Sequence, residues 1–136
     1  MTEKKSVYET ELTFLISNHS GNVLKVSKYS EADRVTFEIL SNGEYVQLAL
    51  DFEQLTGLEM LLRDSEDLPI NHFTGIIQNY TRLAIRKKRI AIDSQQEEDF
   101  YFLELGGVDI RLSEQEYQKL IDVITGLQFI MRKTVA

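Results

Sequence analysis

Hydrophobic and polar positions alternate in a series of short segments along the N-terminal half of the chain. In ELTFLIS (residues 11–17), Leu12, Phe14 and Ile16 share one face, and the polar stretch NHSGN separates this segment from VLKVSKY. RVTFEIL and YVQLAL follow with the same alternation, and SNGE joins them. Because successive side chains of a strand point to opposite faces, this pattern predicts strands with one buried face. We expect four strands before the first helix.

The chain also contains an internal repeat. YVQLALDFEQLTGLEMLL (45–62) aligns with GVDIRLSEQEYQKLIDVI (107–124) at an offset of 62 residues (107 − 45). In each copy a strand ends at a helix-capping residue, and a residue able to complete a capping box follows three positions later: Asp51 with Gln54, and Ser113 with Glu116. Apolar residues at helical spacing then coincide. The repeat predicts two β-β-β-β-α units.

The second unit has a strand pattern of its own. Gly106 and Gly107 suit a two-residue hairpin turn, and pairing across them places Leu105 opposite Val108. Upstream, LAIRKKRIAI (83–92) has its apolar residues at odd positions before RKKR and at even positions after it. One straight strand cannot bury both sets. We therefore expect a turn or bulge within 86–89, with RKKR at a hairpin tip or a bulged edge.

An acidic linker, RDSEDLPIN (63–71), separates the two units and is followed by HFTGIIQNY. In that segment Phe73, Ile76, Ile77 and Tyr80 are spaced as on a helix, which predicts a short linker helix. At the C-terminus, Phe129 and Met131 lie off the apolar stripe of the long final helix. This helix is therefore a candidate for a homodimer contact.

These elements define an α+β fold, with antiparallel curved sheets and helices packed on one side. Residues 1–67 form the first repeat, and residues 68–136 form the second, with the short linker helix and the long C-terminal helix. A unit of that size buries too little surface to be stable alone. We expect the two repeats to pair as an intramolecular pseudo-dimer and form one compact unit.

Composition excludes several classes of function. The 136 residues include no cysteine, so thiolate metal sites and cysteine nucleophiles are excluded. His19 and His72 lack metal-ligand spacing, and the acidic clusters lack the oxygen spacing of a calcium loop. The sequence has no phosphate-binding glycine motif or nucleophile elbow. With no secretory signal or long apolar run, we expect a cytoplasmic protein that is no enzyme and has no cofactor or metal.

Charge is distributed unevenly. The net charge is −7, and all of it lies in residues 1–67, where 13 acidic residues outnumber 6 basic ones, while residues 68–136 carry 9 of each. Within the second half, Arg82 and the RKKR segment place five cations within eight positions. This locally positive region on an acidic background is compatible with a directed binding face.

The repeat pattern resembles known single-stranded nucleic-acid-binding proteins. A unit ending in GVDIRLSEQEYQKLIDVI resembles the family of transcription positive cofactor four, and two units in one chain resemble the purine-rich-element-binding (PUR) family. ELTFLISNHSGNVLKVSK (11–28) is similar to the first PUR hairpin, and the Whirly proteins share the architecture. The resemblance implies curved sheets whose solvent faces bind single-stranded DNA or RNA.

On such faces aromatic side chains stack on bases, and Arg and Lys contact phosphates. The resemblance implies these candidate nucleic-acid-binding residues: Lys25, Tyr29, Tyr45, Arg82, Arg86, Lys87, Lys88, Arg89, Phe100, Phe102 and Arg111. For RKKR the alternative is a solvated turn or protection of a sheet edge, and for Phe100 and Phe102 it is burial under another element. Glu38, Glu104 and Asp109 belong to the same faces and would repel phosphates.

Two functions remain open at this point. The first is a single-stranded nucleic-acid-binding accessory protein of transcription or replication. The second is a protein-interaction or regulatory module on the same scaffold, with an acidic surface, a protein partner and no nucleic-acid binding.

Overall fold

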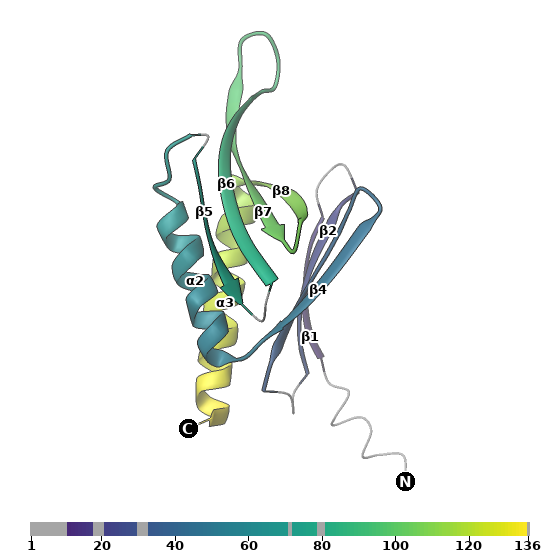
Figure 1. Ribbon diagram of the computed structural model, residues 1–136, viewed down its shortest axis with the longest axis vertical. Coiled ribbons are helices and arrows are strands. Elements are labelled where there is room, and N and C mark those ends of the chain that lie inside the picture. The colour runs from purple at the N-terminus through teal and green to yellow at the C-terminus, as the bar shows by residue number, and fades with distance from the viewer. Residues whose placement is uncertain (1–10, 18–20, 30–32, 71, 79–80, 136) are drawn as a thin grey trace.

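The computed structural model describes residues 11–17, 21–29, 33–70, 72–78 and 81–135. Two four-stranded antiparallel sheets are each followed by a helix, which confirms the expected α+β fold (Figure 1). Sheet 1 has the order β1 (Glu11–Ser17), β2 (Val23–Tyr29), β3 (Val35–Ser41) and β4 (Glu44–Leu50). Helix α2 (Phe52–Ser65) follows. Sheet 2 has the order β5 (Phe73–Gln78), β6 (Thr81–Ala91), β7 (Glu97–Leu105) and β8 (Val108–Ser113), and α3 (Glu114–Val135) ends the chain.

Local sequence explains the turns and helix starts. Both predicted capping boxes form. The Asp51 carboxylate accepts from the Gln54 amide at 2.9 Å, and the Gln54 side chain accepts from the Asp51 amide at 3.0 Å. Ser113 and Glu116 make the same reciprocal pair at the start of α3. The β7–β8 turn has φ +58° at Gly106 and +90° at Gly107, as the Gly-Gly hairpin prediction requires.

The two halves share one hydrophobic core. Apolar side chains from the inner faces of both sheets and from both helices form a single buried cluster. Helix α2 packs against β5 and β6 of sheet 2, whereas α3 contacts β7 and β8, and β3 lies next to β8. Tyr117 of α3 is fully buried, stacks on Tyr101 with ring centroids 3.8 Å apart, and donates to the Leu62 carbonyl at 2.7 Å. Within the described residues, both helices thus pack against the inner, core-forming side of sheet 2.

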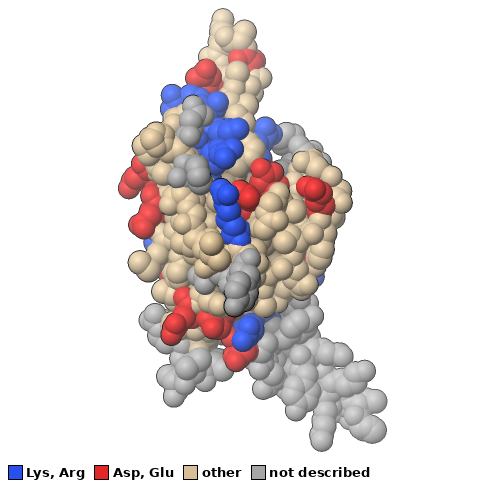
Figure 2. All heavy atoms as spheres, viewed as in Figure 1, with Lys and Arg blue, Asp and Glu red and all other residues tan. Residues whose placement is uncertain are grey.

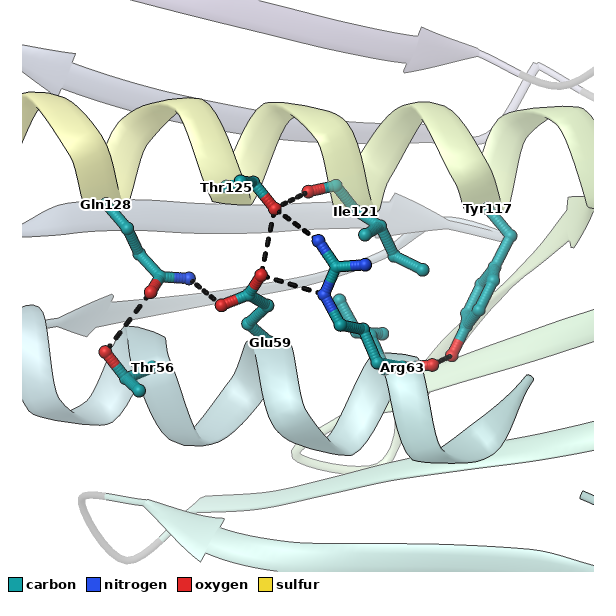
Figure 3. Close-up of polar contacts among 8 residues, drawn as sticks. Thr56, Glu59, Arg63, Tyr117, Ile121, Thr125 and Gln128 are labelled. Carbon is teal, nitrogen blue, oxygen red and sulfur yellow. Dashed lines mark hydrogen bonds and ion pairs between the residues drawn. The ribbon is translucent and has the colours of Figure 1, made fainter. Parts of the chain in front are cut away.

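A polar network joins α2 to α3 (Figure 3). The Glu59 carboxylate accepts hydrogen bonds from Arg63 at 2.9 Å, from Thr125 at 2.9 Å and from Gln128 at 2.6 Å. Burial raises the pKa of Glu59, but these hydrogen bonds outweigh it and hold the pKa below its ordinary value. The network links the helices of the two repeats at their half-buried edge.

The prediction of a linker helix is wrong. Residues 73–78 form strand β5, which pairs with β6 from Phe73–Arg86 to Gln78–Thr81. Without β5 the edge of β6 would lack a hydrogen-bonding partner along this stretch. Ile77 points outward and is 75% exposed, so the helical spacing of its apolar residues does not reflect one buried face.

The prediction of a turn within 86–89 is also wrong. Strand β6 runs without interruption through RKKR, and its register with β7 is continuous from Leu83–Leu105 to Ala91–Glu97. The apolar residues shift from odd to even positions because the far end of β6 extends beyond the core, where no buried face is required. It forms a two-stranded ribbon with β7 that projects beyond the other strands (Figure 1), and Ile92 near its tip is 48% exposed.

Candidate nucleic-acid interface

Six candidate residues lie together on the outer face of sheet 2. In register across three strands, Arg86 of β6 pairs with Phe102 of β7, and Phe102 pairs with Arg111 of β8. In the next row Lys88 pairs with Phe100. We name this surface the basic-aromatic face, made of Arg82, Arg86, Lys88, Phe100, Phe102 and Arg111. In Figure 2, Lys and Arg atoms run down the middle of the molecule, where Figure 1 places β6.

The cations of this face lie close to its aromatic rings. The guanidinium carbon of Arg111 lies 4.5 Å from the centroid of the Phe100 ring, and Phe100 is only 8% exposed. The Lys88 ammonium lies 5.4 Å from the centroid of Phe102, which is half-buried. Neither ring belongs to the hydrophobic core cluster, but the expectation that Phe100 lies exposed on a solvent face is wrong, because Phe100 is buried. Phe102 therefore offers more of its surface to a ligand than Phe100 does.

A hollow of about 90 Å³ lies in the basic-aromatic face. Arg82 lines one side, and Arg86, Lys88 and Phe102 line the other, with Ala84 between them. Next to Ala84, β5 contributes Gly75, where a Cβ atom would lie 2.8 Å from the Leu83 carbonyl oxygen. The absence of large side chains at this pair keeps the sheet surface low between the basic rows.

The other two residues of RKKR point to the opposite side of β6. The Lys87 ammonium donates to the Glu66 carbonyl at 3.0 Å and lies 5.4 Å from the Tyr101 ring centroid. The Arg89 guanidinium binds Asp99 at 2.8 Å. This hydrogen bond holds the pKa of the Asp99 carboxyl below its ordinary value and raises the pKa of Arg89. The four cations of RKKR therefore form two pairs. Arg86 and Lys88 lie on the basic-aromatic face, and Lys87 and Arg89 lie on the opposite face.

The sheet 1 candidates lie apart from the basic-aromatic face. Lys25 pairs with Glu38 at 3.9 Å, and the Tyr45 hydroxyl donates a hydrogen bond to the same carboxylate. That hydrogen bond raises the pKa of Tyr45, whose ring is 57% exposed. Tyr29 ends β2, and its side chain lies outside the described part of the structure. On sheet 1, the candidate cation Lys25 is thus paired with the carboxylate of Glu38.

Two carboxylates also line the hollow, Glu104 of β7 and Asp109 of β8. They are direct cross-strand partners, and Arg82 lies 3.9 Å from Glu104. The sequence identifies both as acidic members of the outer face. It does not identify Gly75 and Ala84 as the residues that keep the hollow open, because that role depends on the pairing of β5 with β6.

Comparisons with known proteins add no relative: no family model, no curated protein and no solved structure matches this chain. Among the described residues, no group of three or more His, Asp or Glu side chains is placed to hold a metal ion. No helix in the described ranges has the length and apolarity needed to cross a bilayer.

Met131, one of the two residues behind the expected dimer contact, is buried, whereas Phe129 is 58% exposed.

Proposed function

We propose that this protein binds single-stranded nucleic acid on the basic-aromatic face of sheet 2. The observation that carries the proposal is the alignment of Arg86, Phe102 and Arg111 in one row across three strands, with Lys88 and Phe100 in the next. Aromatic rings accept bases by stacking, and Arg and Lys contact the phosphates of an extended strand.

The spacing of these cations suits an extended chain. Arg86 and Lys88 are two residues apart on β6, which separates them by roughly 7 Å along the strand. Arg82 continues the same line beyond Ala84. A backbone that follows β6 can place its bases toward β7, over Phe102. Because such contacts do not read base edges, this part of the binding depends on charge and is sensitive to salt.

Strand β6 provides a matched test within four consecutive residues. Fluorescence anisotropy with a labelled single-stranded oligonucleotide would compare Arg86→Ala/Lys88→Ala with Lys87→Ala/Arg89→Ala, which removes the same charge from the opposite face. The first variant is expected to reduce the steepness of the log-log salt dependence by about 1.4, at about 0.7 per phosphate contact on a single strand. The second should leave the slope unchanged.

Phe102→Ala tests stacking separately. It is expected to weaken binding by about 1–3 kcal/mol without changing the salt slope. Equal losses in the two β6 variants would mean that binding reflects net charge alone, and the assignment to this face would be wrong. The absence of any anisotropy change at low salt with the unmodified protein would reject nucleic-acid binding altogether.

A second candidate function, a protein-interaction module, is favoured by the outer face of sheet 1. Leu40 and Tyr45 are direct cross-strand partners, 47% and 57% exposed, and Leu15 is 55% exposed nearby on the same face. Exposed apolar side chains that gather on one face are typical of contact surfaces between proteins. Cross-linking in cells would test this candidate: a specific cross-linked partner that Leu40→Asp abolishes supports it, and no such partner argues against it.

A further inference from the structure

Glu104 and Asp109 place two negative charges directly opposite each other on β7 and β8. Like charges in this position destabilise a sheet. Sheet 1 provides the reference: the registers of the two sheets superpose Glu38 on Glu104 and Gln47 on Asp109, and Glu38 faces the neutral Gln47. The fold therefore does not require a second acid here, and sheet 2 has one at a cost in stability.

Arg82 compensates for only part of this charge. It lies 3.9 Å from Glu104, whereas Asp109 makes no hydrogen bond or ion pair within the described ranges. The Lys88 ammonium, also at the hollow, contacts the Phe102 ring and makes no hydrogen bond or ion pair with any residue that the structure describes. An acceptor and a cation thus lie at the same hollow without pairing, and the row that contains Phe102 separates them.

We propose that this hollow recognises a nucleotide whose base carries an amino group, and that it discriminates against thymine and uracil. The inference rests on the proposed function. The base stacks on Phe102 in place of the Lys88 ammonium, which moves to the phosphate. The amino group then donates to Asp109 or Glu104.

The chemistry of the bases decides which of them fit. Cytosine, adenine and guanine each carry an exocyclic amino donor, and carboxylates accept from such groups. Thymine and uracil present carbonyl oxygens at the corresponding positions, and two carboxylates repel them. A well-placed contact of this kind separates the right base from the wrong one by about tenfold or more in affinity.

The test measures anisotropy at low salt with labelled homopolymeric deoxycytidine, deoxyadenosine and deoxythymidine strands of equal length. The variants are Asp109→Asn and Glu104→Gln, which keep the side-chain size and remove the charge. Glu38→Gln is the matched control, because Glu38 occupies the position of Glu104 on the other sheet. Circular dichroism of each variant establishes that it is folded.

The unmodified protein and Glu38→Gln are expected to bind deoxycytidine and deoxyadenosine strands about tenfold more tightly than deoxythymidine strands. Asp109→Asn is expected to reduce this ratio to about twofold, mainly by improving the binding of deoxythymidine. Equal affinities for the three strands in the unmodified protein would overturn this inference and leave the proposed function intact. A ratio that neither Asp109→Asn nor Glu104→Gln changes would overturn it as well. A lack of binding to every strand would overturn both.

Discussion

The outer faces of the two sheets differ far more than their inner faces. Superposing the sheets by register aligns buried apolar residues on buried apolar residues: Leu24 on Leu83, Val26 on Ile85, and Leu50 on Leu112. The middle row of the outer faces changes completely. On the three strands that can be compared, it is Ser27, Thr36 and Ala49 in sheet 1, whereas in sheet 2 it is Arg86, Phe102 and Arg111.

The adjacent row differs in shape as well as in charge. Sheet 1 has Leu15 and Lys25 where sheet 2 has the smaller Gly75 and Ala84, and the hollow lies beside Ala84. Burial dictates the inner faces, because each sheet must cover the same shared core. The outer faces carry no such requirement. Their difference is the reason for proposing that sheet 2, and not sheet 1, carries the binding surface.

The largest predicted effect comes from giving sheet 2 the middle row of sheet 1. Arg86→Ser/Phe102→Thr/Arg111→Ala removes two cations and one stacking ring while leaving the core untouched. We expect single-strand affinity at low salt to fall by about 100-fold or more, since stacking alone contributes about 1–3 kcal/mol. Anisotropy measures the loss.

The control for this exchange is on sheet 1. Lys25→Ala/Tyr45→Ala removes a cation and an aromatic ring from that outer face, and affinity is expected to stay within about twofold. A comparable loss of single-strand affinity in the sheet 1 and sheet 2 variants would contradict the proposal that binding occurs on sheet 2 alone.

The second prediction concerns Gly75, the cross-strand partner of Ala84, which lines the hollow. Gly75→Ala introduces a Cβ atom 2.8 Å from the Leu83 carbonyl oxygen, a backbone atom that cannot easily move. We expect the free energy of unfolding to fall by about 1–3 kcal/mol, as for other overpacked sites. Leu15→Ala changes the matching residue of sheet 1, which is 55% exposed, and should alter stability by no more than about 0.5 kcal/mol. Denaturant titrations of both variants would contradict this prediction if the losses were equal.

The third prediction uses the acidic pair. Asp109→Asn removes like-charge repulsion with Glu104 and is expected to raise the free energy of unfolding by about 0.2–1 kcal/mol at neutral pH. Gln47→Asp creates the same repulsion opposite Glu38 on sheet 1 and should lower it by a similar amount. Thermal melts of the two variants should therefore shift in opposite directions. Shifts in the same direction would show that cross-strand charge does not control stability at this position.

The smallest predicted effect is local and depends on pH. The hydrogen bond from Arg89 lowers the pKa of Asp99 in the folded protein, so the ionised Asp99 carboxylate stabilises the folded state. This contribution of Asp99 to the free energy of unfolding is fully present above the ordinary pKa of an aspartate. It is lost as the pH falls through the lowered pKa. Amide hydrogen exchange in the β6–β7 ribbon should then accelerate by less than about tenfold beyond the intrinsic pH effect. Arg89→Ala should abolish this acid dependence, and exchange in β2 and β3 should not show it.

Much of the fold was predictable from short-range patterns. Strand alternation, the two capping boxes and the Gly106-Gly107 turn each depend on neighbours within a few residues, and the structure contains all of them. The opposite faces of Phe102 and Leu103 follow from strand periodicity alone. The shared outer face of Phe100 and Phe102 was predicted in the same way.

Long-range pairing decided the rest. HFTGIIQNY has helical spacing, but its residues 73–78 form β5 because β6 offers an edge to pair with. Strand β6 continues without a bulge through RKKR because β7 pairs with it as far as Ala91. This uninterrupted alternation places Arg86 and Lys88 on the basic-aromatic face and Lys87 and Arg89 on the other. The sequence by itself determined which residues form strands, turns and helix caps in most of the chain. Only the tertiary structure decided which cations share a face with Phe102, because strand neighbours far apart in sequence set that arrangement.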